Sequence, residues 1–202
     1  MVYVLLADGF EEIEAVTPVD ILRRGEAETK FVSVSDVQIE HAKGRLVRPF
    51  GSLRTRNLFV TGARGITVKA DLALETLDLK RGDHIIVPGG MRGVENLEAM
   101  PNVLKLLAHA SDRGISLCAI CAGPRVLAKA GVFSETEITC YPGLENEMQG
   151  AVCRPEAEVV KNKGVITARA AGSAVDFGLA ILEDIKGGPA AEKVRKAIVY
   201  DS

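Results

Sequence analysis

A cysteine stands where an apolar segment gives way to a helical one. Residues 115–121 read ISLCAIC, and the chain then turns through Ala-Gly-Pro into the helical pattern of 124–131. A side chain at such a strand-to-helix turn is lifted above the sheet, as in a nucleophile elbow. The positive end of the helix dipole favours thiolate over thiol there. The pattern therefore predicts that Cys121 is a nucleophile, with the backbone N–H groups of Ala122 and Gly90 as an oxyanion hole.

The three histidines are poor candidates for a base beside this cysteine. His41 falls in a basic loop, His84 opens a strand at its amino end, and His109 belongs to a helix face. Each is most simply structural or solvated. The residue that follows the cysteine is alanine, so no histidine is adjacent in sequence either. A general base must come from another residue type.

Glutamates at the start of the first helix supply such a group. Glu11 and Glu12 are expected to complement the helix dipole. Glu14 lies close to the apolar face that carries Ile13 and Val16, at the carboxyl end of the first strand. A carboxyl group held partly buried there has a raised pKa and can donate a hydrogen bond to the sulfur. Glu14 is therefore predicted to be the general acid or base.

The remaining cysteines receive different interpretations. Cys118 and Cys121 form a CxxC pair, but strand residues three apart lie about 10 Å apart on opposite faces, beyond disulfide reach. Cys118 is predicted to lie in the hydrophobic core. Cys140, in TCYPG, is a candidate neighbour of the site, and Cys153 has no predicted role. The spacing of His and Cys residues is not that of metal ligands, so no metal is predicted.

Short apolar runs alternate with amphipathic segments along the chain. VYVLLA at 2–7, the helical pattern of 11–25 and TKFVSVS at 29–35 give a βαβ signature. The run HIIVP within 84–90 is apolar throughout, which indicates a strand buried on both faces. The sequence therefore predicts an α/β domain with a mostly parallel sheet between helices. Further elements are expected at 102–114, 115–121, 124–131, 164–170 and 174–187.

Three loops are predicted to gather at one edge of this sheet, because ligands bind beyond the carboxyl ends of parallel strands. They are DGFEEIE after the first strand, PGGMRG after the strand at 84–90, and CAGP after the strand at 115–121. Gly89 and Gly90 alone are typical of any βα turn, since glycine adopts conformations that other residues avoid. Together the three loops predict one site.

Composition predicts a single globular domain over 1–202. The chain is 47% hydrophobic and 26% charged with a net charge of −2, which gives no general attraction for nucleic acid or membrane. Its apolar runs are far shorter than the roughly 20 residues that cross a bilayer. The start of the chain has no basic leader, and four cysteines without a signal peptide predict reduced thiols and a cytoplasmic location.

Three motifs, EEIEAVTPVDILRR, VPGG and AICAGP, in this order and separation, resemble the DJ-1 branch of the ThiJ/PfpI superfamily. TARAAGSAVDFGLAILE near the carboxyl end fits too. The resemblance implies a flavodoxin-like three-layer α/β sandwich, a homodimer, and an elbow cysteine paired with a glutamate. By position, Cys121 matches the reactive cysteine and Glu14 its partner carboxyl. Gly89 and Gly90 match the loop that faces the sulfur, and Arg169 matches an arginine near the site.

Two departures from the family pattern bear on activity. The protease-like branch has histidine directly after the cysteine, so Ala122 argues against a peptidase. Some members with glyoxalase activity have histidine before the proline of the loop after the elbow helix, where this chain has Tyr141. Tyr141 is a candidate catalytic residue in place of that histidine, because tyrosine can donate a hydrogen bond. It is a poor base at neutral pH, so proton transfer would depend on Glu14.

The resemblance and these residues together imply a cofactor-independent cysteine enzyme acting on small reactive carbonyls. Methylglyoxal would become lactate, or glycated groups would be repaired, through Cys121 with Glu14. A second class of function stays open, in which the protein is a redox sensor or chaperone controlled by oxidation of Cys121 to sulfinate. Turnover without oxidant favours the enzyme, whereas a gain of two oxygens that alters partner binding favours the sensor.

A basic stretch over residues 41–70 contains seven Lys or Arg and no Asp or Glu. Relative to the family, the chain is expected to carry an insertion or extended hairpin at about 37–60. Such a stretch is most simply a solvated surface hairpin. The alternative is an arm that binds nucleic acid or an acidic protein. Its only aromatic rings are Phe50 and Phe59, which is a small number for a surface that stacks bases. Its phosphate contacts would come from Arg45, Arg48, Arg54 and Arg56.

Overall fold

A seven-stranded sheet forms the centre of the computed structural model, which describes residues 1–34 and 58–201. The strand order is β10-β11-β7-β6-β1-β2-β5, and every neighbouring pair is parallel except β10 with β11 at one edge. The predicted mostly parallel sheet is confirmed. The strands are β1 (Val2–Leu6), β2 (Thr29–Ser33), β5 (Leu72–Ala73), β6 (His84–Val87), β7 (Ser116–Ile120), β10 (Val159–Asn162) and β11 (Val165–Ala168).

Continuous apolar strands are buried on both faces, as the run HIIV suggests. Every residue of β1 and β6 is buried. Successive side chains of a strand point to opposite faces, so Val4 joins one hydrophobic cluster and Leu5 the other. Because both faces exclude water, the strands need no polar alternation.

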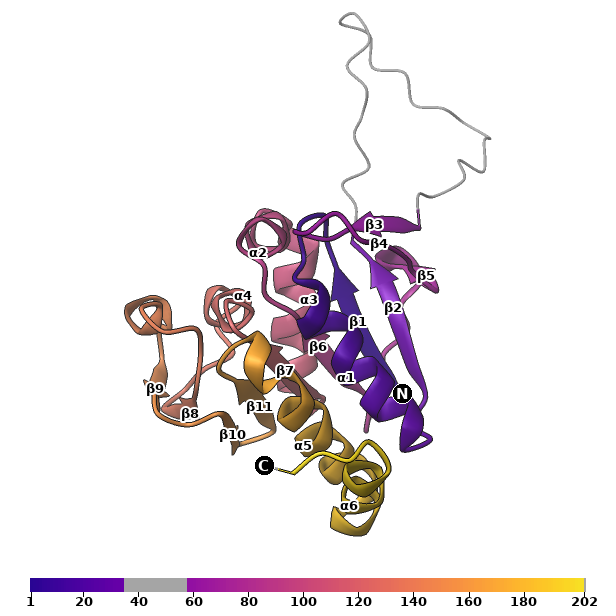
Figure 1. The fold of residues 1–202 in the computed structure, drawn as a ribbon. Helices are drawn as coiled ribbons and strands as arrows, with labels where there is room; N and C mark the ends of the chain where they lie inside the picture. The colour runs from indigo at the N-terminus through magenta and orange to yellow at the C-terminus, as the bar shows by residue number, and fades with distance from the viewer. Residues whose placement is uncertain (35–57, 202) are drawn as a thin grey trace, which may run out of the picture.

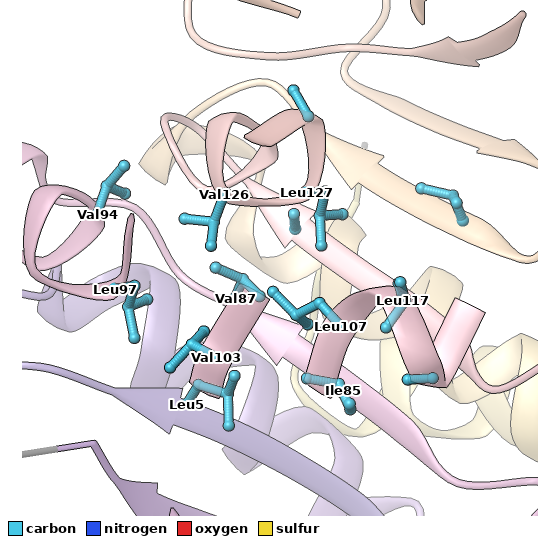
Figure 2. Close-up of a cluster of buried hydrophobic side chains, with 14 of the residues drawn as sticks. Leu5, Ile85, Val87, Val94, Leu97, Val103, Leu107, Leu117, Val126 and Leu127 are labelled. Atoms are coloured by element: carbon cyan, nitrogen blue, oxygen red, sulfur yellow. The ribbon is translucent and has the colours of Figure 1, made fainter. Parts of the chain in front are cut away.

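Helices cover the two faces and make the molecule three-layered (Figure 1). Helices α1 (Glu12–Arg24), α5 (Ala174–Lys186) and α6 (Gly188–Ala197) lie on one side, and α2 (Met91–Glu98), α3 (Pro101–Asp112) and α4 (Pro124–Lys129) on the other. Figure 2 shows the second side, where side chains of all three helices meet the sheet. The labelled residues are Val94, Leu97, Val103, Leu107, Val126 and Leu127 over Leu5, Ile85, Val87 and Leu117.

Small elements flank the sheet, and among them the β3–β4 hairpin lies within the basic stretch that was predicted to form a surface hairpin. Strands β3 (Phe59–Thr61) and β4 (Thr67–Lys69) form a hairpin, and β8 (Thr136–Ile138) pairs with β9 (Ala151–Cys153) in parallel. Helices α2 and α6 fall in segments without a predicted element. Three short 3-10 helices complete the described part: η1 (Leu74–Thr76), η2 (Glu145–Glu147) and η3 (Ala171–Ser173).

The predicted insertion at about 37–60 falls mainly on residues 35–57, which lie outside the described residues. So do His41, Phe50 and the four arginines proposed for phosphate contacts. The β3–β4 hairpin is the described remainder of the basic stretch. Across 1–34 and 58–201, no helix combines the length and apolar character needed to span a membrane.

Candidate active site

The predicted strand-to-helix turn at Cys121 has a strained backbone. Cys121 follows the end of β7 with a φ of 62°, in the left-handed region that L-residues rarely adopt. Its N–H donates to the Ala168 carbonyl oxygen at 2.9 Å. A Cβ on Gly123 would lie 2.3 Å from the Val87 carbonyl oxygen, so only glycine fits the turn. Together, the two flanking strands and this glycine hold the cysteine half-buried at the edge of the sheet.

The carboxyl group of Glu14 is buried at the same edge. The side chain is 1% exposed, and its Oε2 accepts the Gly89 N–H at 2.8 Å. The backbone N–H of Glu14 donates to Glu11 Oε2 at 2.9 Å, so Glu11 caps α1 as expected. The first turn of α1 thus points one carboxyl group inward, while another caps the helix.

Gly89 is the point around which the reactive groups meet. A Cβ built there would lie 2.4 Å from Glu14 Oε2, 2.9 Å from Cys121 Cβ and 3.1 Å from the Ala122 nitrogen. The side chains of Glu14 and Cys121 are hydrogen-bonded, and the Ala122 N–H donates to the Cys121 sulfur. Only a residue without a side chain leaves room for this contact.

Burial governs the ionisation of this pair. It raises the pKa of Glu14 from 4.5 to about 7, against the lowering effect of the Cys121 and Gly89 hydrogen bonds. The prediction of a raised carboxyl pKa is confirmed. Burial, followed by the neighbouring Glu14 carboxylate, also raises the pKa of Cys121. The expected thiolate stabilisation is wrong for the resting pair, because the Ala122 N–H alone acts in the lowering direction and does not offset burial and the Glu14 carboxylate.

Two expectations for the first turn of α1 need correction. Ile13 and Val16 are 53% and 42% exposed, so the face that buries Glu14 is not theirs. Glu12 does more than complement the dipole. It is buried, and its Oε1 accepts the Arg64 N–H at 2.7 Å and the Ile66 N–H at 3.3 Å. It anchors the turn of the β3–β4 hairpin.

Gly90 brings the first two predicted loops together. Its φ is 87°, and a Cβ there would lie 2.4 Å from the Gly9 carbonyl oxygen. The Glu11 N–H donates to the Gly89 carbonyl oxygen at 3.0 Å. With Cys121 against Gly89, all three loops meet at one edge, which confirms the predicted convergence. The role of Gly90 in an oxyanion hole stays a prediction.

Tyr141 and Arg169 both lie next to the elbow, but neither side chain has a described contact with the sulfur. The Tyr141 N–H donates to the Cys121 carbonyl oxygen at 2.8 Å, and its ring is half-exposed. The Arg169 guanidinium donates to Glu158 Oε1 at 3.2 Å, and Ser173 donates to the other oxygen of that carboxylate. Arg169 is therefore paired with an acid, and the functional roles of both residues stay predictions.

Two cysteines and two histidines of the described residues lie away from the Cys121 sulfur or beside it, as the sequence suggests. Cys118 is fully buried, as predicted for core. His84 is buried at the opposite end of the sheet, with Nε2 3.0 Å from Asp184 Oδ2, and His109 is exposed. Cys140 is buried in the segment that precedes Tyr141. Among the described residues, no cluster of three His, Cys, Asp or Glu could hold a metal ion.

Comparison with known proteins places this geometry in a family. The model of the DJ-1/PfpI family matches residues 1–184. The chain belongs to the DJ-1/PfpI family. It is 30% identical over 200 residues to the Parkinson disease protein 7 homolog of Danio rerio, covering 97% of this chain and 95% of that protein. It is 31% identical over 178 residues to glutathione-independent glyoxalase DJR-1.2 of Caenorhabditis elegans, covering 88% and 83%.

Solved structures support the same assignment. Drosophila melanogaster DJ-1beta matches with a TM-score of 0.84 and 27% identity, over 100% of this chain and 98% of that one. The predicted flavodoxin-like α/β class is confirmed for this DJ-1/PfpI chain. The resemblance stated from three short motifs is confirmed as well.

Proposed function

We propose that this DJ-1-type protein is a cofactor-independent cysteine enzyme that converts small reactive carbonyls such as methylglyoxal to hydroxy acids. The observation that carries the proposal is the pairing of Cys121 with a buried Glu14 whose pKa is raised to about 7. A base with that pKa can both accept and donate a proton at neutral pH. The similarity to a glutathione-independent glyoxalase supports the same chemistry.

The first step forms a covalent adduct. The Cys121 sulfur attacks the aldehyde carbon while the Glu14 carboxylate takes the thiol proton, so the raised pKa of Cys121 is overcome as the C–S bond forms. The Ala122 N–H, which donates to the sulfur in the resting state, and the Gly90 N–H stabilise the developing alkoxide. Protonation of that oxygen gives a hemithioacetal.

The second stage moves a proton between neighbouring carbons. Glu14 removes the proton from the sulfur-bearing carbon of the adduct and returns a proton to the adjacent carbon, which converts the hemithioacetal to a thioester. Water then cleaves the C–S bond, releasing lactate and the Cys121 thiol. The sum is methylglyoxal plus water giving lactic acid. Repair of glycated groups would use the same attack on an aminocarbinol adduct.

Turnover of methylglyoxal to lactate by the reduced protein tests the proposal. Cys121→Ser should abolish turnover, and Glu14→Gln should lower it by about 100-fold to 10,000-fold. Cys153→Ser and Asp20→Asn are matched controls. Cys153 is a thiol outside the pair, and Asp20 is an exposed acid of the same helix. Equal turnover in wild type and Cys121→Ser would refute the proposal.

A redox-sensing role is the second candidate, favoured by the contact of a half-buried Cys121 with a carboxyl that is protonated below about pH 7. A protonated Glu14 can donate a hydrogen bond to a sulfinate. Intact mass before and after dilute peroxide separates the two functions. If the protein shows no methylglyoxal turnover and Cys121 gains two oxygens, the redox-sensing function is favoured over the enzyme.

A further inference from the structure

Cys140 and Cys153 bring two thiols together beside the candidate active site. Cys140 follows β8 and is buried, whereas Cys153 ends β9 and is half-buried; both are free thiols. The parallel register pairs Cys153 with Ile138, and the Arg154 N–H donates to the Ile138 carbonyl oxygen at 2.8 Å. Cys140 lies two residues beyond Ile138, just past the end of β8, which places it diagonally across the strand pair from Cys153.

The two thiols and a backbone oxygen form a hydrogen-bonded chain. Cys140 donates to the Cys153 sulfur, and Cys153 Sγ donates to the Glu145 carbonyl oxygen at 3.7 Å. Burial raises the pKa of Cys140 to about 12. Burial also raises the pKa of Cys153, but there the hydrogen bond from Cys140 acts in the lowering direction. Cys153 is therefore the more accessible of the two thiols, and the hydrogen bond from Cys140 favours its thiolate.

We propose that Cys140 and Cys153 are a second redox site, a dithiol that forms an intramolecular disulfide by exchange with a small disulfide such as oxidised glutathione. The Cys153 thiolate attacks one sulfur of oxidised glutathione and releases the first glutathione thiol. The Cys140 sulfur loses its proton, attacks Cys153 Sγ and releases the second. The protein loses two protons and two electrons, which the two glutathione thiols gain.

The location gives this disulfide a structural consequence. Cys140 directly precedes Tyr141, whose N–H donates to the Cys121 carbonyl oxygen at 2.8 Å. The disulfide therefore ties the segment that contacts the elbow to the end of β9. The proposal stands apart from the proposed enzyme activity, because it uses neither the Cys121 sulfur nor Glu14.

The test exposes reduced wild-type protein to oxidised glutathione and maps its peptides without reduction. Glu145 and Glu147 lie between the two cysteines, so a protease that cleaves after glutamate separates them unless a disulfide joins them. We expect joined peptides and a loss of two hydrogens. Cys140→Ser should instead retain one glutathione on Cys153, because the resolving thiol is gone. Cys153→Ser should form neither product.

Separate peptides with glutathione retained on Cys153 in the wild type would overturn the proposal. So would identical products from wild type and Cys140→Ser. If Cys140→Ser does not fold, Cys140→Ala makes the same comparison with an apolar replacement. Fully buried Cys118 is the internal control. Glutathione on Cys118 would show that unfolded molecules react, and would also overturn the assignment to the folded site.

Discussion

At the residue scale, the fold buries the Glu14 carboxyl group where its ionised form is disfavoured. The carboxyl group is 1% exposed and lies against Cys121, with the Gly89 N–H as its backbone donor. Burial is the largest cause of the raised pKa, and one N–H does not replace the lost hydration of a carboxylate. The same placement that suits proton transfer therefore makes stability depend on pH.

The stability of the fold should fall as Glu14 ionises. Its folded pKa of about 7 exceeds 4.5, so stability from the protonated form is fully present below about pH 4.5 and is lost as pH rises through about 7. Glu14→Gln cannot ionise. As the pH rises from about 4.5 to about 8, the free energy of unfolding of wild type, measured with urea, should fall relative to that of Glu14→Gln by on the order of 3 kcal/mol.

Asp20→Asn is the control for this comparison, because Asp20 is an exposed carboxylate on the same helix. Its stability should follow the wild-type pH curve closely. If the Glu14→Gln curve also ran parallel to wild type, the inward carboxyl would not be titrating in the fold.

Gly89 is the second residue on which the site depends. Gly89→Ala would place a methyl group 2.4 Å from Glu14 Oε2 and 2.9 Å from Cys121 Cβ, forcing the pair apart. We expect about 100-fold lower methylglyoxal turnover, since a displacement near 1 Å misaligns reacting groups. Gly172→Ala is the matched control, because nothing lies within 4 Å of a Cβ there. Unchanged turnover in Gly89→Ala would refute the contact.

At the element scale, the β3–β4 hairpin is fastened to the loop that carries the candidate acid. The Gly9 N–H donates to the Thr61 carbonyl oxygen at 2.8 Å, and the Ala63 N–H donates to the Phe10 carbonyl oxygen at 2.7 Å. Glu12 adds a carboxylate that receives two more N–H groups of the hairpin turn. Hydrogen bonds thus join the β3–β4 hairpin, the loop before α1 and the first turn of α1 into one unit.

Removal of the Glu12 carboxylate should loosen this unit. Glu12→Ala leaves the Arg64 and Ile66 N–H groups without their charged acceptor, which costs about 2–3 kcal/mol. Denaturant unfolding should show that loss, and hydrogen exchange should speed up at these two amides. Asp20→Ala, which removes only a surface ion pair with Arg24, should change stability by less than about 1 kcal/mol. Equal effects of both variants would contradict the anchoring role.

At the scale of the whole molecule, α1 presents apolar side chains to the surface on the side away from Glu14. Ile13 and Val16 are both exposed within one turn of the helix. Two exposed apolar side chains within one helical turn form an apolar strip that a second copy of the helix can cover. We propose that the expected homodimer forms through this helix and the loops around it.

Ile13→Glu should then weaken self-association, because a carboxylate would have to be desolvated in the interface. Sedimentation equilibrium of wild type should give a dimer and the variant a higher dissociation constant. Val199→Glu is the control, since Val199 is 84% exposed near the carboxyl end. A monomeric wild type, or equal dissociation constants for wild type and Ile13→Glu, would reject the proposed interface.

The local features of this protein follow from residue types that are neighbours in the chain. Apolar runs set the buried strands, and the Cys-Ala-Gly-Pro corner set the elbow at Cys121, because backbone conformation and two-sided burial depend on neighbouring residue types. The sequence also indicated that Glu14 is a buried site residue. The reason given, that it lies near the face of Ile13 and Val16, was wrong because that face is exposed. Residues 35–57 lie outside the described chain.

Contacts between segments that are remote in the chain could not be predicted, because they depend on distances that exist only in the folded protein. The position of Gly89 between Glu14 and Cys121, the Glu12 anchor and the Cys140–Cys153 pair join residues far apart in the chain. The prediction that the thiolate of Cys121 is stabilised is wrong for the same reason. A helix dipole can be predicted from local pattern, but burial and a carboxylate from another loop raise the pKa only once the chain has folded.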